Sequence, residues 1–113
     1  TTPLQALNLL NDPVFFEAAQ GLATRVLRET SASLNERIRY AFELCLARSP
    51  KPDELERLVR FYEEQKEYLR RNPEAAESLY AAHGVEGVDS AEAAVWVSIS
   101  RALLNLDEFI TRG

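Results

Sequence analysis

Apolar residues recur along the chain at the three- and four-residue spacing of amphipathic helices, and short polar or proline-containing segments separate one pattern from the next. The segment Thr2–Gln5 combines a capping residue with a proline at the first helical position, so a short helix is expected to run to about Asn11. Asp12-Pro13 begins a second helix in the same way, and this helix should fade between Glu29 and Ala32. Its apolar positions are Phe15, Ala18, Leu22 and Val26.

Two further helices are predicted in the middle of the chain, with a proline-rich stop between them. Ser33-Leu34-Asn35-Glu36 is a full capping box for the third helix, and Arg48–Pro52 ends it because each proline disfavours α geometry in the residue before it. Pro52-Asp53-Glu54 starts a long fourth helix. The inward faces comprise Leu34, Ile38, Ala41, Phe42 and Cys45 on the third helix and Leu55, Leu58, Val59, Tyr62 and Leu69 on the fourth. The charged side chains expected to face water are Arg60, Glu63, Glu64, Lys66, Glu67, Arg70 and Arg71.

The last third of the chain predicts a short helix and then a strongly apolar one. Asn72-Pro73-Glu74 starts a helix that should end at Gly84, and residues 85–88 form a loop. Asp89–Glu92 has the capping pattern of a final helix, which is apolar almost all round from Ala93 to Leu106. Such a helix is usually covered on most sides. We therefore expect an all-α fold, a compact irregular bundle of five to six helices with an apolar central C-terminal helix.

A phrase near the start of the chain is echoed near its end. Leu9–Phe15 and Leu103–Phe109 both read Leu-Leu-Asn, three residues, Phe. Because the first copy contains a helix break at Asp12-Pro13, the likeness is local and does not indicate two copies of one unit. We expect the first and last segments to pack together, with Leu10, Phe15, Leu103 and Phe109 in the core.

Composition limits the classes of partner. The 113 residues carry 13 basic and 18 acidic side chains, a net charge of −5, and no basic field that would attract nucleic acid is evident. No apolar run reaches the roughly 20 residues of a membrane span. The chain begins Thr-Thr-Pro and has no methionine, so residues 1–113 are expected to be a single helical domain, excised from the C-terminal end of a larger protein.

Few residues suggest chemistry. His83, the single histidine, is either a cap-region surface residue or a general base, and the first is favoured because it precedes Gly84 at a helix end. Cys45 is interpreted as a core residue. No Cys-x-x-Cys-His motif, Gly-rich phosphate loop or Ser-His-acid arrangement is present in the sequence, so no catalytic residue, cofactor or metal is predicted.

Most polar candidates have a structural interpretation beside the functional one. Helix capping explains Asp12, Glu36, Asp53, Glu54, Asp89 and Glu92. Arg37, Arg39 and Arg48 bind either an anionic ligand or, as we favour, helix-end carbonyls and nearby acids, with Arg48–Glu54 the specific pair expected. Glu67–Arg71 has the favourable i,i+4 order. The aromatic residues Tyr62, Tyr68, Tyr80 and Trp96 either line a groove or, as we favour, pack in the core. Asn11 and Asn105 should be half-buried and hydrogen-bonded.

Several strings resemble one family. The opening Thr1–Pro13 is unusually specific, and Arg37-Ile38, Ala41-Phe42, Leu46, Arg48–Pro50, Glu54 and the ending Ala102–Phe109 accompany it. Together they resemble the closing region of a planctomycete-associated family, domain of unknown function 1553. The departures are Ala47, where glycine is expected, and Leu106, where a small polar residue is common; both are compatible with a helix. The structural signature comprises Pro3, Leu10, Asn11, Pro13, Phe15, Arg48, Pro50, Asn105 and Phe109.

The resemblance implies context and no established catalytic residues. It implies a large exported bacterial protein, periplasmic or on the cell surface, which often carries a c-type cytochrome-like domain elsewhere; any haem would belong to that part. The leading hypothesis is a non-catalytic structural or interaction domain of a larger extracytoplasmic protein, whose partners are other domains of the same parent. The alternative is an accessory part of a multidomain redox or polysaccharide-processing enzyme. The oligomeric state stays open.

Overall fold

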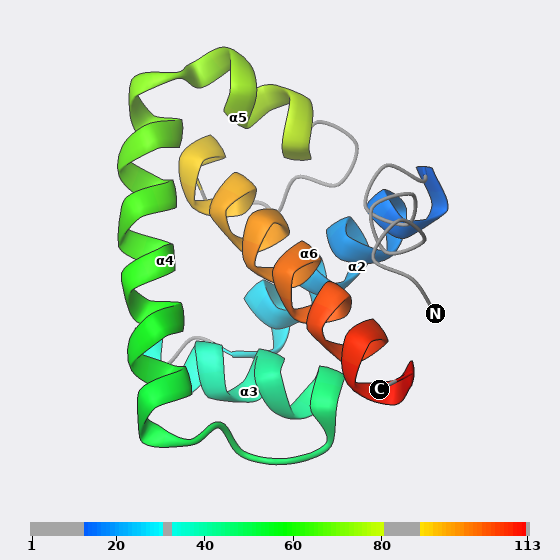
Figure 1. Ribbon diagram of the computed structural model, residues 1–113. Coiled ribbons are helices and arrows are strands. Elements are labelled where there is room, and N and C mark those ends of the chain that lie inside the picture. The colour runs from blue at the N-terminus through cyan, green and yellow to red at the C-terminus, as the bar shows by residue number, and fades with distance from the viewer. Residues whose placement is uncertain (1–12, 31–32, 81–88, 113) are drawn as a thin grey trace.

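Five helices make up the part of the chain that the computed structural model describes, residues 13–30, 33–80 and 89–112 (Figure 1). They are α2 (Pro13–Glu29), α3 (Leu34–Leu46), α4 (Pro52–Arg71), α5 (Pro73–Tyr80) and α6 (Ser90–Arg112). No strand occurs within these residues, which confirms the predicted all-α bundle. The short helix expected to end at Asn11 and the helix end expected at Gly84 lie outside the described residues.

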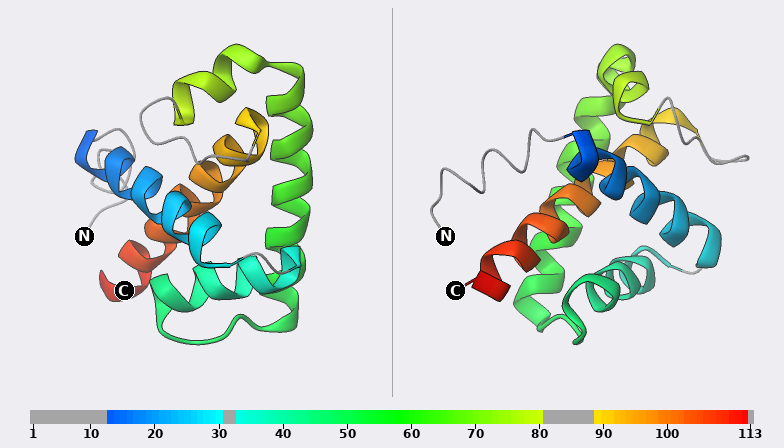
Figure 2. Two further views of the ribbon diagram at one scale, coloured as in Figure 1. Left: turned by 180° about the vertical axis from the view of Figure 1, so that it is seen from behind. Right: turned by 90° about the vertical axis from the view of Figure 1, so that its right-hand side faces the viewer.

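The last helix, α6, lies at the centre of the bundle. It contacts each of the other four helices. Figure 1 shows α4, α5 and α3 arranged around it, and the view from behind in Figure 2 places α2 across its far face. All residues from Ala93 to Val97 are buried, and so are Ile99 and Leu103. The predicted central helix is therefore confirmed, because a helix that is apolar on most sides needs neighbours on most sides.

The face that α2 turns to the core differs from the predicted one. Ala18 is exposed, whereas Ala19 and Ala23 are buried together with Val26 and Leu27. The expectation for Ala18 was wrong, whereas Val26 is buried and Leu22 packs partly buried against the core, as expected. The cause lies in the sequence, where Ala18 and Ala19 offer two stripes of similar hydrophobicity and only the contact with α6 decides between them. Small side chains at the contact let two helices approach closely.

The inward faces of α3 and α4 agree with the sequence pattern. Ile38, Ala41 and Phe42 are buried, and Leu34 and Cys45 pack against the core beside them. On α4, Leu69 is buried, and the other predicted residues pack partly buried against the same core: Leu55, Leu58, Val59 and Tyr62. The spacing of three and four residues was sufficient here because each helix has one unambiguous apolar stripe.

Side-chain caps define two of the helix starts, as the sequence predicted. The hydroxyl of Ser33 accepts a hydrogen bond of 3.3 Å from the backbone N–H of Glu36. The carboxylate of Asp89 accepts one of 2.7 Å from the N–H of Glu92. Each bond satisfies a backbone donor that the first turn of a helix leaves without an intrahelical partner.

The turn between α3 and α4 contains a left-handed residue. Ala47, at the C-terminal cap of α3, has φ 58° and ψ 29°, and its N–H donates to the carbonyl of Glu43 at 2.9 Å. A side chain with a Cβ atom is disfavoured in this region, where glycine is the usual residue. The expectation that Ala47 is compatible with a helix was therefore wrong, and the structure explains why glycine suits this position.

Candidate functional site

A half-buried carboxylate, that of Glu92 in the first turn of α6, is the centre of the candidate site. Its Oε1 atom accepts a hydrogen bond of 2.5 Å from the hydroxyl of Tyr62 and lies 2.8 Å from Nζ of Lys66. Its Oε2 atom accepts a bond of 2.9 Å from the indole nitrogen of Trp96. Only 16% of the Glu92 side chain is exposed. These residues and Arg37 form what we call the Glu92 site.

Helical spacing places the four central side chains opposite one another. Tyr62 and Lys66 are one turn apart on α4, and Glu92 and Trp96 are one turn apart on α6. Residues at i and i+4 share a face of a helix. When α4 packs against α6, the hydroxyl of Tyr62 and the ammonium of Lys66 therefore meet the carboxylate of Glu92, beside the indole N–H of Trp96. The Tyr62 and Trp96 rings lie 5.9 Å apart with an interplanar angle of 50°.

Arg37 extends the Glu92 site to two more helices. It stands on α3, and its guanidinium lies 3.8 Å from Oε2 of Glu92. Its Nε donates a hydrogen bond of 3.1 Å to the carbonyl of Thr30, just after the end of α2. A cation at the end of a helix satisfies its last carbonyls and the negative end of its dipole. The prediction that Arg37 bonds a helix-end carbonyl and a nearby acid agrees with these contacts.

The surroundings keep Glu92 ionised. Burial raises the pKa of its carboxyl, but the hydrogen bonds from Lys66, Tyr62 and Trp96 outweigh burial and hold that pKa below its usual value. The same contact acts on the cation, since the hydrogen bond to Glu92 raises the pKa of Lys66 against the opposing effect of burial. The pair is therefore charged on both sides at neutral pH.

Tyr62 is held as a protonated donor. Lys66 Nζ lies 3.4 Å from its hydroxyl, a position from which a cation favours the phenolate. Burial and the hydrogen bond to Glu92 act more strongly in the other direction, and the pKa of Tyr62 is raised. A general base needs a pKa near the working pH and a proton within reach. Tyr62 does not meet the first condition, and both oxygens of Glu92 already accept hydrogen bonds.

A second cluster, at the corner between α3 and α4, confirms the expected pairing of Arg48 with Glu54. The guanidinium donates two hydrogen bonds of 2.9 Å to the two carboxylate oxygens, a bidentate arrangement. It also lies 4.9 Å from the ring centroid of Phe42. Glu54 accepts a further bond of 2.8 Å from the N–H of Lys51. The bonds from Arg48 and Lys51 lower the pKa of Glu54 to about 2.

The other predicted residues are dispersed. Cys45 packs partly buried against the core, and Arg39 is exposed on α3. Tyr68 is 55% exposed, so the expectation that it packs in the core was wrong. Asn105 is half-buried as expected, but its Oδ1 atom is buried without a hydrogen-bond partner among the described residues, so the expected hydrogen bond of that oxygen is not found. The expectations for Pro3, Leu10, Asn11, Tyr80 and His83, and for the side chains of Phe15 and Phe109, lie outside the described part.

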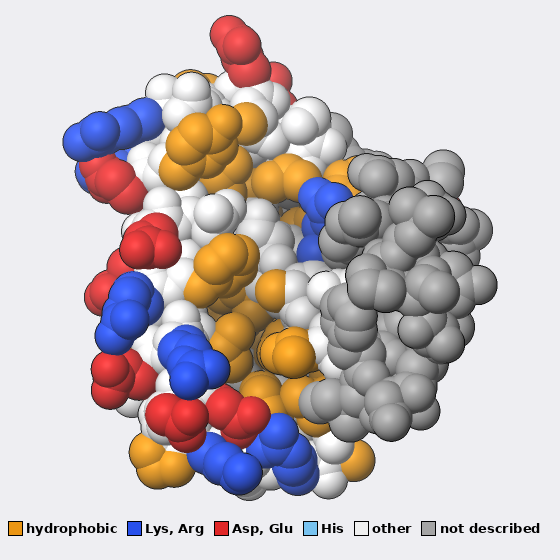
Figure 3. Space-filling model, in the orientation of Figure 1, with side chains coloured by type: hydrophobic (Ala, Val, Ile, Leu, Met, Phe, Trp, Pro, Cys, Tyr) orange, Lys and Arg blue, Asp and Glu red, His pale blue; other side chains and the backbone are white. Residues whose placement is uncertain are grey.

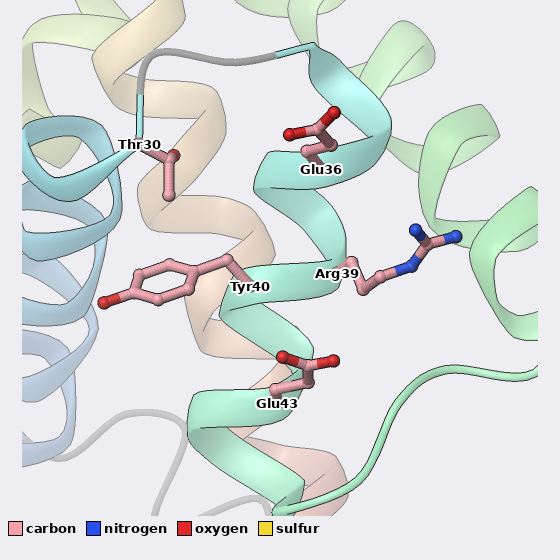
Figure 4. Close-up of a pocket in the computed structure, with 5 residues that line it drawn as sticks. All are labelled: Thr30, Glu36, Arg39, Tyr40 and Glu43. Carbon is pink, nitrogen blue, oxygen red and sulfur yellow. The ribbon is translucent and has the colours of Figure 1, made fainter.

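A surface hollow of about 380 Å³ lies beside α3. Figure 4 shows that its side chains do not converge: Tyr40 points towards α2, while Arg39 points the opposite way. The hydroxyl of Tyr40 donates to the carboxylate of Glu29. A binding site for a small molecule is concave with polar groups aimed at one point. This hollow lacks that arrangement, which leaves the Glu92 site as the better defined candidate.

The described residues include no group of three His, Cys, Asp or Glu side chains that could hold a metal ion. No helix among them has the length and hydropathy needed to span a membrane.

Sequence reasoning missed the Glu92 site as a unit. It assigned Glu92 to helix capping and placed Lys66 on the solvent side of α4, and the second assignment was wrong. The ammonium of Lys66 turns towards Glu92, and the side chain is 39% exposed. The available signal was one i,i+4 pair of a polar and an aromatic residue on each of two helices. These pairs are Tyr62 with Lys66 and Glu92 with Trp96.

The fold and these two clusters define a small all-α bundle whose polar groups join its helices. The family model described as "Protein of unknown function (DUF1553)" matches residues 1–62, more than half of the chain. The chain belongs to this family. The match includes Arg48, Pro50 and Glu54, so the α3–α4 corner lies inside the matched region. Neither curated proteins nor solved structures gave a match.

Proposed function

We propose that this chain is a non-catalytic helical domain of a larger extracytoplasmic bacterial protein and that it serves packing or partner binding within that parent. The observation that carries the proposal is that donors from within the bundle occupy both carboxylate oxygens of Glu92. Both of its oxygens accept hydrogen bonds from within the bundle, from Tyr62 and Lys66 on one side and Trp96 on the other. A carboxylate bound in this way joins helices, since both of its oxygens already have donors within the bundle.

The surface beside α4 supports a partner-binding role. Figure 3 shows hydrophobic side chains gathered beside the charged side chains of α4. Tyr68 of α4 is a large hydrophobic side chain with 55% of its surface exposed. Tyrosine is enriched at interfaces because it combines a large apolar ring with a polar hydroxyl. The occupant that fits the proposal is another domain of the same parent.

The test separates partner binding from catalysis. The isolated domain and the remaining domains of the parent are mixed, and their association is measured by size-exclusion chromatography. Association is expected with the natural domain and should weaken at least about tenfold for Tyr68→Asp. Glu63→Gln, a substitution of an exposed residue on the same helix, is the matched control and should bind normally. Turnover of sugar or ester substrates by the isolated domain, abolished by Glu92→Gln without unfolding, would instead identify an enzyme.

A further inference from the structure

The chain's single tryptophan and a tyrosine direct their polar hydrogens at one acceptor. The indole N–H of Trp96 and the O–H of Tyr62 donate to the two oxygens of Glu92, at 2.9 and 2.5 Å. The ring centroids are 5.9 Å apart. Indole and phenol are side chains that a strong oxidant converts to radicals, and the phenol becomes a strong acid when it loses an electron. Glu92 is already hydrogen-bonded to that phenolic proton, so it is placed to accept the proton when the phenol is oxidised.

We propose that Trp96, Tyr62 and Glu92 form a proton-coupled redox site, in which an electron vacancy on Trp96 passes to Tyr62 while the phenolic proton passes to Glu92. A one-electron oxidant, a metal complex or metalloprotein of high potential, first takes one electron from the indole. Tyr62 then returns one electron to the indole, and its O–H bond breaks as a new O–H bond forms on Oε1 of Glu92. The products are a neutral indole, a tyrosyl radical, a protonated carboxyl and the oxidant reduced by one electron.

The two rings of this transfer differ in burial. Trp96 is 0% exposed, so a radical on its ring is shielded from solvent. Tyr62 is half-buried and lines a surface hollow of about 270 Å³ beside Lys66 and Arg70. Lys66 Nζ lies 3.4 Å from the phenolic oxygen and remains a donor to that oxygen after the proton has left. The phenol is thus the outer end of the pair, and the electron vacancy moves from the interior towards the surface.

The acceptor is in the required protonation state. Glu92 must be ionised to take the proton, and its hydrogen bonds keep its pKa low despite burial. A second phenol–carboxylate pair supplies an internal comparison. Tyr40 donates to Glu29, but both groups lie at the surface, and the chain's one tryptophan is the partner of Tyr62. Tyr40 therefore tests whether a hydrogen-bonded phenol alone is sufficient.

The experiment follows radicals in the purified chain after flash generation of tris(bipyridine)ruthenium(III). Transient absorption should show the tryptophan radical decaying at the rate at which a tyrosyl radical appears. In Tyr62→Phe the tryptophan radical should persist at least about tenfold longer, and in Tyr40→Phe its decay should be unchanged. In Glu92→Gln the transfer should slow by about tenfold or more, because the proton acceptor is lost.

Two outcomes would overturn the proposal. The first is a tryptophan radical that decays at the natural rate in Tyr62→Phe. The second is the absence of a solvent isotope effect in the unsubstituted chain, since transfer of the phenolic proton with the electron requires slower decay in D2O. The second measurement needs no substitution, so it decides the matter even where Glu92→Gln reduces folding. Failure of the redox site leaves the partner-binding proposal untouched, because that proposal rests on association measured without an oxidant.

Discussion

Arg37 and Glu92 face each other across the bundle with 3.8 Å between a guanidinium nitrogen and a carboxylate oxygen. Arg37 also bonds the carbonyl of Thr30 after α2, and Glu92 bonds Tyr62 and Lys66 of α4. One pair of residues therefore connects four helices through polar contacts. Groups that share partners in this way contribute non-additively to the free energy of unfolding, so the loss of one group weakens the contacts of the others.

Replacing Glu92 by glutamine should lower the free energy of unfolding by about 1–3 kcal/mol. The substitution keeps the shape but removes the charge that pairs with Lys66 and Arg37, leaving their cations partly buried without compensation. Urea unfolding followed by the fluorescence of Trp96, the only tryptophan, measures the loss.

The matched control for that substitution is Glu56→Gln. Glu56 forms an i,i+4 pair with Arg60 at 3.0 Å, but its side chain is 74% exposed, and such pairs contribute about 0.5 kcal/mol or less. Equal losses for the two substitutions would contradict the structural importance of the Glu92 site.

Stability should fall as the pH is lowered through the range in which carboxylates titrate. The pKa of Glu54 is about 2 in the folded chain against an ordinary value of 4.5, because Arg48 and the N–H of Lys51 bind its ionised form. The pKa of Glu92 is also lowered. A group whose pKa is lower in the folded state stabilises the fold above its unfolded pKa, and this contribution is lost as the pH falls towards the folded pKa.

Urea midpoints measured between about pH 7 and pH 2.5 check this dependence. The decline should begin near pH 4.5 and continue towards pH 2. Glu54→Gln removes one titrating group, so its midpoint should be lower at pH 7 and should vary less with pH. An unchanged pH profile in this variant would show that Glu54 does not contribute to acid sensitivity.

Ala47→Gly should stabilise the chain by about 0.5–1 kcal/mol. Ala47 has φ 58°, a left-handed conformation that costs a residue with a Cβ atom about 1 kcal/mol, and glycine adopts it without that steric cost but loses more backbone entropy. Thermal unfolding measures the gain. Ala18→Gly, at an exposed helical position of α2, should instead lose about 1 kcal/mol. Destabilisation by both substitutions would argue against the left-handed geometry.

Ser100→Ala should raise stability or leave it unchanged, with a gain of up to about 1 kcal/mol. Ser100 is 0% exposed, and its hydroxyl oxygen has no hydrogen-bond partner among the described residues. A buried polar group without a partner has lost its hydration and gained no bond in return. Differential scanning calorimetry should show an equal or higher melting temperature. A loss above about 1 kcal/mol would reveal a partner for this hydroxyl.

Local features of the fold were predictable because their causes are local. The helix starts at Ser33 and Asp89 follow from capping residues, and the Arg48–Glu54 pair follows from a short turn that brings its ends together. The central position of α6 followed from its apolar surface alone. The caps and the ion pair depend on residues within about two turns of one another, and the position of α6 depends on its own apolar surface.

Features that depend on how helices cross were not predictable in the same way. Tyr62 and Glu92 are 30 positions apart in the sequence, and either one alone has an ordinary local explanation. The choice between Ala18 and Ala19 on α2 depends on the rotation of that helix against α6, which no local pattern determines. Tertiary packing thus decided both the candidate site and the buried stripe.

Gln20 shows how one buried amide holds a short helix in place. It lies on α2, is 4% exposed, and donates a hydrogen bond of 2.6 Å to the carbonyl of Leu79 in the last turn of α5. The last four carbonyls of a helix have no intrahelical partner, and α5 has only 8 residues, too few to be stable alone. Gln20→Ala should therefore cost about 1–2 kcal/mol and should loosen α5 in particular.

Hydrogen exchange can localise the effect of losing Gln20. Amide protons of α5, whose Leu79 carbonyl accepts the bond from this amide, should exchange faster in Gln20→Ala, while those of α3 should exchange at rates set only by the global loss of stability. Ser78→Ala is the control within α5, because its hydroxyl donates locally to the carbonyl of Ala75 and is exposed. If α5 and α3 lost protection equally in Gln20→Ala, α5 would be an integral part of the cooperative core, and the amide bond from Gln20 would not be what holds it.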